Sequence, residues 1–330
     1  MLKNMTFYDQ SKTLRQFAGD YAVDNWSTQS SAADNYWLSV CWSPELSLFC
    51  AVSETGTGDR VMTSPDGITW TIRSSAADND WQSVCWSPEL GLFCAVASSG
   101  TGDRVMTSPD GITWTIRSSA ADNYWQSVCW SPELGLFCAV SLTGSGNRVM
   151  TSPDGINWTS RTSAADHYWM SVCWSPELGI FCAVAWTGTD QVMTSPDGIT
   201  WTLRTIPEVN SWYGVCWSPE LGLFCAVAKS GTVDKQVMTS PDGITWTTRT
   251  SATDNDWYTV CWSPELGLFC AVAIPGTGDL VMTSPDGINW TTRASAADNY
   301  WYDVCWSPEL GLFCAVSYTG TGNRVMTSIM

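Results

Sequence analysis

Hydrophobic and polar residues follow one pattern that recurs about every 44 residues along the chain. In one copy, four short segments rich in Val, Thr, Trp and Phe are separated by turn sequences: 81–87, 92–97, 104–108 and 112–117. Short segments of this composition, spaced by turn signals, indicate an all-β domain. The intervening PELG and SPDG sequences supply the Pro, Asp and Gly residues that tight turns require.

The first two segments of each copy are apolar on both faces, as in SVCW and LFCAV. A sheet with one face in water would alternate between apolar and polar residues. We therefore expect each four-stranded unit to be packed between two others. The first Trp of each copy, such as Trp37, should lie between units rather than stack on a sugar. Radial repetition of such units is the signature of a β-propeller.

The number of units follows from the sequence CWSPEL, which begins at Cys41, Cys85, Cys129, Cys173, Cys216, Cys261 and Cys305. The last copy ends at RVMTS and lacks its fourth segment, whereas Trp26 precedes the first copy in the register of a fourth segment. We expect an all-β chain that forms a single seven-bladed β-propeller with four antiparallel strands per blade. Its last blade is closed by the N-terminal strand, which removes an open sheet edge. Residues 22–330 would form the propeller and residues 1–21 an N-terminal extension.

The sequence SPDGITW at residues 64–70, which recurs with small changes five more times, resembles the Asp-box of sialidase-like, BNR-repeat propellers. Here Asp66 and Gly67 are adjacent, so the motif is one residue shorter than the box. The resemblance implies a structural hairpin far from any active site, and it carries over no catalytic residue. The whole array also resembles uncharacterised repeat propellers of bacteria, phages and large DNA viruses.

The net charge of the chain excludes some classes of binding partner. The chain has 32 acidic and 15 basic residues and a net charge of −17. Such a protein repels phosphate backbones and anionic lipid, so we expect no nucleic-acid or membrane partner. No apolar run approaches the roughly 20 residues of a membrane helix, and the first residues lack the apolar core of a secretory signal. We expect a cytoplasmic or virion location.

Candidate catalytic chemistry is sparse. The single histidine, His167, is expected to be a solvated loop residue, and it excludes His-based triads and His-rich metal sites. Most arginines recur once per blade, which indicates a structural role rather than the arginine cluster of a sialidase. We therefore expect no enzyme, no cofactor and no metal.

The fourteen cysteines fall two per repeat and nine residues apart, for example Cys85 and Cys94. The two should face each other across the first hairpin of the blade. Buried thiols are favoured over disulfides, and both over a zinc site, because zinc usually takes a closely spaced cysteine pair.

Two positions vary freely while the framework is almost invariant. One lies in the loop after the second strand: Glu54, Ser98, Leu142, Trp186, Lys229, Ile274 and Tyr318. The other follows the first Trp: Leu38, Gln82, Gln126, Met170, Tyr213, Tyr258 and Tyr302. In a propeller both belong to one face, near the mouth of the channel. The variation indicates either a recognition surface on a rigid scaffold or drift at positions that do not pack.

Repeats four and five depart most from the pattern, because their loops change length and carry the unmatched Trp186. The candidate binding residues are Trp186, Lys229, Lys235, Glu208, Tyr213, Tyr258, Tyr302 and Tyr318. We expect a binding propeller that presents this variable face to a glycan or protein ligand. The alternatives are a structural component of a virus or phage particle, and a designed or reconstructed repeat protein.

Overall fold

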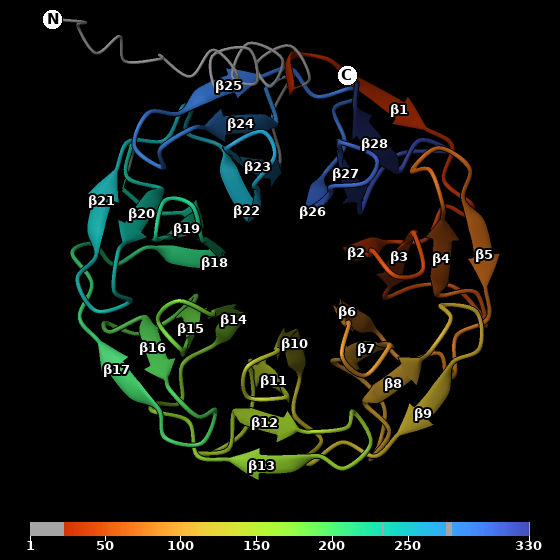
Figure 1. Ribbon diagram of the computed structural model, residues 1–330, viewed down its shortest axis with the longest axis horizontal. Helices are drawn as coiled ribbons and strands as arrows, with labels where there is room; N and C mark the ends of the chain where they lie inside the picture. The colour runs from red at the N-terminus through yellow and green to blue at the C-terminus, as the bar shows by residue number, and fades with distance from the viewer. Residues whose placement is uncertain (1–22, 233, 275–278, 330) are drawn as a thin grey trace, which may run out of the picture.

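Seven four-stranded antiparallel sheets surround a central axis in the computed structural model, which describes residues 23–232, 234–274 and 279–329 (Figure 1). Each sheet is one blade, and its strands follow one another from the axis to the rim. The expected seven-bladed propeller is confirmed. The expected N-terminal extension, residues 1–21, lies outside the described residues. No helix among the described residues is long and apolar enough to cross a membrane.

Strands of one type keep nearly the same length in every blade. The innermost strands are β2 (Trp37–Ser43), β6 (Trp81–Ser87), β10 (Trp125–Ser131), β14 (Trp169–Ser175), β18 (Ser211–Ser218), β22 (Asp256–Ser263) and β26 (Trp301–Ser307). The second strands are β3 (Leu48–Ser53), β7 (Leu92–Ala97), β11 (Leu136–Ser141), β15 (Ile180–Ala185), β19 (Leu223–Ser230), β23 (Leu268–Ile274) and β27 (Leu312–Ser317). The third strands are β4 (Val61–Ser64), β8 (Val105–Ser108), β12 (Val149–Ser152), β16 (Val192–Ser195), β20 (Val237–Ser240), β24 (Val281–Ser284) and β28 (Val325–Ser328). The outer strands are β5 (Thr71–Arg73), β9 (Thr115–Arg117), β13 (Thr159–Arg161), β17 (Thr202–Arg204), β21 (Thr247–Arg249), β25 (Thr291–Arg293) and β1 (Trp26–Gln29).

The outer strands are shorter than the sequence pattern predicts. In blade two the ladder begins at Thr115 rather than at Ile112. The Asp110 carboxylate accepts the backbone N–H groups of Ile112 and Thr113 at 2.8 and 2.7 Å. These two N–H groups therefore belong to the SPDG turn and not to the sheet.

The apolar core lies between blades. Trp81 is fully buried, with Val52 and Val61 of blade one and Phe93 of its own blade in the same cluster. Its indole N–H donates to the Ala77 carbonyl at 3.1 Å, so the buried ring leaves no unpaired polar atom. The expected packing of the first Trp of each copy between blades is confirmed.

The N-terminal strand β1 closes blade seven. It pairs antiparallel with β28, from Trp26 opposite Ser328 to Gln29 opposite Val325. The indole of Trp26 donates to the Val23 carbonyl at 3.1 Å, as the Trp70 indole donates to the Gly67 carbonyl at 3.0 Å. The orphan segment therefore reproduces the outer strand of a complete blade, although it lacks the SPDG turn.

Each SPEL turn is hydrogen-bonded to the next blade. The indole Nε1 of Trp86 donates to the Glu45 carboxylate at 2.6 Å. The same bond recurs, at 2.5 or 2.6 Å, in Trp42–Glu309, Trp130–Glu89, Trp174–Glu133, Trp217–Glu177, Trp262–Glu220 and Trp306–Glu265. A repeated bond of this kind explains why Glu and Trp recur at fixed places in CWSPEL.

The fourteen cysteines are free thiols. Cys85 and Cys94 are directly opposite each other on β6 and β7, as expected. The thiol on each second strand is fully buried and the one on each innermost strand is half-buried. Burial raises the pKa of Cys85, and the Cys94, Cys41 and Cys129 sulfurs around it raise it further. These thiols remain protonated and act as small apolar side chains.

Candidate functional site

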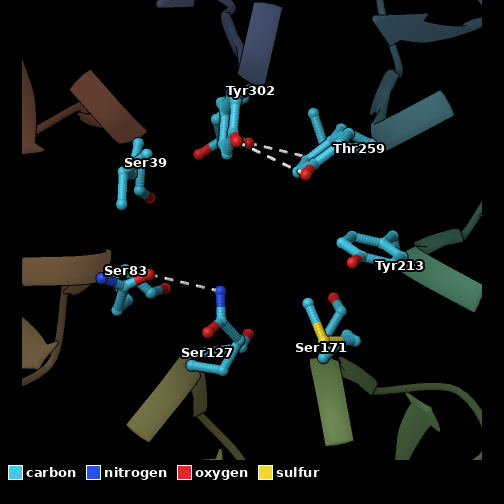
Figure 2. Close-up of a pocket in the computed structure, with 14 residues that line it drawn as sticks. Ser39, Ser83, Ser127, Ser171, Tyr213, Thr259 and Tyr302 are labelled. Carbon is cyan, nitrogen blue, oxygen red and sulfur yellow. Dashed lines mark hydrogen bonds between the residues drawn. The ribbon is translucent and has the colours of Figure 1, made fainter. Parts of the chain in front are cut away.

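A hollow of about 530 Å³, including the part open to solvent, lies at one mouth of the channel, where the innermost strands begin (Figure 2). The cavity volume without the open part is about 100 Å³, which is smaller than the range of about 300–1,000 Å³ found for ligand sites, so a larger ligand would lie across the mouth. Each innermost strand contributes two consecutive residues. The first ring of residues is Leu38, Gln82, Gln126, Met170, Tyr213, Tyr258 and Tyr302. The second ring is Ser39, Ser83, Ser127, Ser171, Gly214, Thr259 and Asp303.

A β-bulge near the start of each innermost strand explains why the first ring lines the channel. In blade two the pairing shifts between Trp81 and Ser83, so Gln82 has no partner on β7. The shift recurs at the same place in the other six blades. A bulge re-aims the side chain of its extra residue. The position that varies most along the inner wall is therefore the one that the ladder does not constrain.

Aromatic side chains occupy one part of this mouth in an unbroken series. We call Tyr168, Trp186, Tyr213, Tyr258, Tyr302, Tyr318 and Tyr36 the aromatic arc. Successive ring centroids along it are 6.0, 5.9, 4.8, 4.3, 5.2 and 4.0 Å apart. These separations are typical of interacting aromatic pairs. The arc runs from blade four through blades five, six and seven to the loop before blade one.

Gly214 permits the close approach of two blades beneath the arc. A Cβ at this position would lie 2.8 Å from the Thr259 Cα and the Tyr258 carbonyl oxygen, so no larger residue fits without movement. The Tyr213 and Tyr258 rings, on the neighbouring first-ring positions, are 4.8 Å apart.

Lys229 supplies a cation to the centre of the arc. Its Nζ lies 5.4 Å from the Tyr213 ring centre and 5.2 Å from that of Tyr258, within the range of cation–π attraction. The same Nζ donates to the Tyr258 hydroxyl at 3.1 Å. Burial, followed by the neighbouring Tyr302, raises the pKa of Tyr258 and brings that of Tyr213 to about 12. The tyrosines are therefore neutral at physiological pH, with hydroxyls that can both donate and accept.

The second ring gives the hollow a polar wall. The Ser39 hydroxyl accepts the backbone N–H of Val84 in the next blade at 3.2 Å. Ser83, Ser127 and Ser171 do the same for Val128, Val172 and Val215. The Ser39 O–H donates to Asp303, whereas the O–H groups of Ser83, Ser127 and Ser171 can donate to a ligand.

Asp303 takes the serine position where blade seven meets blade one. Its carboxylate accepts the N–H of Val40 at 2.9 Å, the N–H of Val304 at 2.9 Å and the Thr259 hydroxyl at 3.1 Å. Burial raises the pKa of Asp303 to about 6, although these hydrogen bonds and one from Ser39 act to lower it. Loss of solvation thus outweighs four hydrogen bonds to the charged form.

Amides stand across the mouth from the arc. The Gln126 Nε2 lies 3.5 Å from the Gln82 Oε1, and the Gln82 Nε2 donates to the Ser98 hydroxyl at 3.2 Å. Figure 2 shows Ser83 and Ser127 on one side of the hollow and Tyr213 and Tyr302 on others. The site therefore offers aromatic rings on one part of its wall and amide or hydroxyl groups on another, with the apolar side chains of Leu38 and Met170 at the first-ring positions between them.

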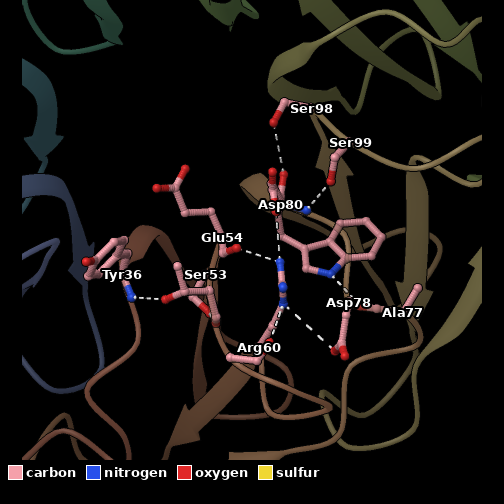
Figure 3. Close-up of polar contacts among 12 residues, drawn as sticks. Tyr36, Ser53, Glu54, Arg60, Ala77, Asp78, Asp80, Ser98 and Ser99 are labelled. Carbon is pink, nitrogen blue, oxygen red and sulfur yellow. Dashed lines mark hydrogen bonds and ion pairs between the residues drawn. The ribbon is translucent and has the colours of Figure 1, made fainter.

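Arginines join neighbouring blades around the same face. Arg60 donates to the Asp80 carboxylate at 2.9 Å and lies 3.8 Å from that of Asp78, both in the loop that enters blade two (Figure 3). Arg104 and Arg324 donate to the backbone carbonyls of the next loop, those of Asn123 and Asn35, at 2.9 and 3.0 Å. The structural role expected for these arginines agrees with this geometry.

Six of the eight candidate residues lie together and two lie apart. Trp186, Tyr213, Tyr258, Tyr302 and Tyr318 belong to the arc, and Lys229 lies against it. Lys235 and Glu208 instead form an ion pair at 3.0 Å, which ties together two loops of blade five. Glu208 also accepts the Thr232 hydroxyl at 2.6 Å. We therefore leave the Lys235–Glu208 pair out of the site.

His167 differs from expectation. Its ring is half-buried and packs against Trp169, with centroids 5.6 Å apart, so it is not a solvated loop residue. His167 is at the repeat position that Asn123 holds in the preceding blade. The Asn123 amide donates to the Asn147 carbonyl of the following loop at 2.8 Å. The buried Nδ1 of His167 has no hydrogen-bond partner among the residues that the structure describes.

Sequence reasoning missed Asp303, Tyr36 and Tyr168 as site residues. Asp303 had a detectable signal, since the equivalent residues in the first four blades are all serine. Tyr36 and Tyr168 had none, because Tyr124 and Tyr300 occupy the same repeat position and do not join the arc. Among the described residues, no group of three or more His, Cys, Asp or Glu side chains could hold a metal ion.

Comparison with known proteins finds no matching family model and no matching curated protein. Solved structures do match in shape. A streptogramin B lyase superimposes with a TM-score of 0.77 at 7% identity, over 92% of this chain and 96% of that one. YCF48 from Cyanidioschyzon merolae gives 0.69 at 13% identity, over 92% and 98%. A chain of the mitotic checkpoint complex gives 0.67 at 13% identity, over 94% and 92%. At these identities the chain is similar to propellers of differing function, and the likeness shows the fold alone.

Proposed function

We propose that this chain is a non-enzymatic binding propeller that takes a neutral glycan in the hollow at its channel mouth. The observation that carries the proposal is the asymmetry of the mouth. The framework repeats in every blade, whereas the aromatic arc covers blades four to seven and the entry to blade one. A single site per chain follows from that asymmetry.

The chemistry of the wall fits a sugar. A pyranose presents C–H groups on its faces and hydroxyls around its edge, so it needs both apolar rings and hydrogen-bonding groups. The arc supplies the rings, while Gln82, Gln126 and the serine hydroxyls supply donors and acceptors. Convergent polar groups within an aromatic-lined hollow are typical of small-molecule sites.

The charges favour a neutral ligand. An anionic ligand would be repelled by two carboxylates. Asp303 lines the hollow, and Glu54 accepts a hydrogen bond from Tyr318, a member of the arc. A cation would instead meet Lys229, whose ammonium already occupies the faces of Tyr213 and Tyr258. A ligand of either charge would face a like charge in a site of low dielectric constant.

The same geometry supports binding rather than hydrolysis. Glycosidases generally use two carboxyl groups on either side of the scissile bond. Among the residues that line the hollow, Asp303 is the one carboxylate, and its two oxygens accept hydrogen bonds from Val40, Val304 and Thr259. Such a carboxylate is held by the wall and is poorly placed to attack or protonate a substrate.

Other interpretations stay open as predictions. A protein ligand is the alternative to a glycan, and the aromatic arc would suit a proline-rich peptide. Membership of the Asp-box group, a viral or phage relationship, a particle role and a cytoplasmic or virion location are further predictions. We favour the glycan because the wall combines aromatic faces with many separate hydroxyl and amide groups.

The experiment is a glycan array probed with the labelled protein, followed by calorimetry with each sugar that binds. Tyr258→Ala should lower affinity at least about tenfold, because it removes the central ring of the arc and a partner of Lys229. Tyr124→Ala is the matched control, since Tyr124 is 49% exposed on the same face and lies outside the arc. An array without binding, or equal losses in both variants, would refute the proposal. Binding of a proline-rich peptide in the same assay would assign the site to a protein ligand instead.

A further inference from the structure

The aromatic arc extends beyond the hollow at both ends. Tyr213, Tyr258 and Tyr302 line the hollow itself. Trp186 and Tyr168 continue the arc on one side, each 42% exposed, and Tyr318 and Tyr36 continue it on the other. A ligand confined to the hollow would leave these four rings unused.

The arc is also curved. Its members come from blades four to seven and the loop that enters blade one, and these blades follow one another around the channel axis (Figure 1). Neighbouring planes along it are inclined by 22° to 58°. A straight ligand would contact a few adjacent rings and then leave the arc, whereas a curved ligand can follow all of them.

Linkage decides whether a sugar chain curves. In β-1,4-linked glucans each residue is turned over relative to the last, which gives a flat and straight ribbon. In α-1,4-linked glucans the axial bond turns every step in the same direction, so the chain coils. Such a coil matches a concave row of aromatic rings.

We propose that the arc binds a curved segment of an α-1,4-linked glucan, with several consecutive sugar residues stacked along it. This inference rests on the proposed glycan-binding function and names the class of glycan. Tyr302 and those parts of Tyr213 and Tyr258 that line the hollow and are not covered by Lys229 would contact the central residues. Trp186 and Tyr36 would contact the outer ones. Lys229 and the hydroxyls of the second ring would hydrogen-bond the sugar edges that face the channel.

Calorimetry with a length series tests the inference. Maltohexaose should bind at least about tenfold more tightly than maltose, because more aromatic surface is covered. Cellohexaose contains the same six glucose units and differs in linkage alone, so it is the matched ligand control. It should bind at least about tenfold more weakly than maltohexaose.

Variants at the ends of the arc locate the effect. Trp186→Ala and Tyr36→Ala should remove much of the gain of maltohexaose over maltose, because both residues lie in the arc beyond the hollow. Tyr124→Ala should change neither ligand. Equal affinity for maltose and maltohexaose, or for the α- and β-linked hexamers, would overturn the inference while the glycan-binding proposal stands. If no sugar binds on the array, the proposed function itself fails.

Discussion

The Trp42 indole donates to the Glu309 carboxylate at 2.6 Å and so joins the first blade to the last across 267 residues. The same bond links every other pair of neighbouring blades, but there the two residues are 40 to 42 positions apart. Identical chemistry thus serves both ordinary packing and ring closure. This allows a comparison in which a single bond is removed either at the closure or in the middle of the chain.

Glu309→Ala should destabilise the fold by about 1.5–3 kcal/mol, the typical contribution of a hydrogen bond to a charged group. Glu133→Ala removes the equivalent bond between blades three and four and is the control. Because Glu309 bridges the two ends of the chain, its loss should selectively increase hydrogen exchange in β1 and β28, measured by mass spectrometry. Equal exchange of β1 in both variants would show that this bond does not secure the closure.

Deleting residues 1–29 removes β1, exposes the edge of β28 and takes away the buried Trp26. We expect a loss of several kcal/mol, since a buried Trp alone contributes about 3–5 kcal/mol. Deleting residues 1–22 leaves β1 in place and is the control. If the protein that lacks residues 1–29 melts at the parental temperature, strand donation by the N-terminus adds no stability.

Asp303 should make stability fall as pH rises. Its folded pKa, about 6, exceeds the ordinary Asp value of about 3.9, so ionisation is harder in the folded chain. The free energy of unfolding that Asp303 contributes, relative to Asp303→Ser, is fully present below pH 4. It is lost as pH rises through 6, and the loss is at most about 3 kcal/mol. Chemical denaturation of both proteins from pH 4 to 8 measures this difference.

Asp286→Ser is the control with the opposite sign. Burial alone would raise the pKa of Asp286, but the N–H groups of Asn289 and Ile288 and two side-chain hydrogen bonds lower it. Its contribution should therefore be present above pH 4 and lost as pH falls further. A difference curve for Asp303 that is flat, or that rises with pH, would contradict the raised pKa.

Lys229→Ala should weaken glycan binding about three- to tenfold, because it removes the cation over Tyr213 and Tyr258 and the donor to the Tyr258 hydroxyl. Lys229→Arg retains a cation and should keep most of the affinity. Lys235→Ala is the control, because Lys235 pairs with Glu208 outside the arc. Calorimetry with a sugar selected by the array distinguishes them, and a Lys235 effect as large as that of Lys229 would place the site elsewhere.

The thiols should be unreactive in the folded protein and fully reactive after unfolding. Burial raises the pKa of Cys85 and its equivalents, so little thiolate forms at pH 8. Alkylation without a reductant should modify few sites in the native protein and all fourteen in denaturant, as counted by intact-mass spectrometry. Protection of most sites in denaturant would indicate disulfides.

Strand positions were predictable where the sequence signal is local. The ranges 81–87 and 92–97 were predicted to the residue, because apolar runs end there at turn sequences. The outer strand was predicted three residues too long, since nothing in ITW reveals that the Asp110 carboxylate takes the first two N–H groups. Side-chain competition for backbone donors is settled by turn geometry, which the pattern does not encode.

The sequence by itself determined the number of blades, their order and the closure by Trp26, because a repeat that buries both faces must be flanked on each side and an incomplete last copy must be completed. It also separated a constant framework from two variable positions. Only the tertiary structure decided that Trp186, Tyr213, Tyr258, Tyr302 and Tyr318 meet Tyr168 and Tyr36 in one arc, and that Lys235 does not. The reason is geometric: radial packing brings residues about 44 positions apart into contact, and the direction of each side chain depends on a bulge and on the neighbouring blade.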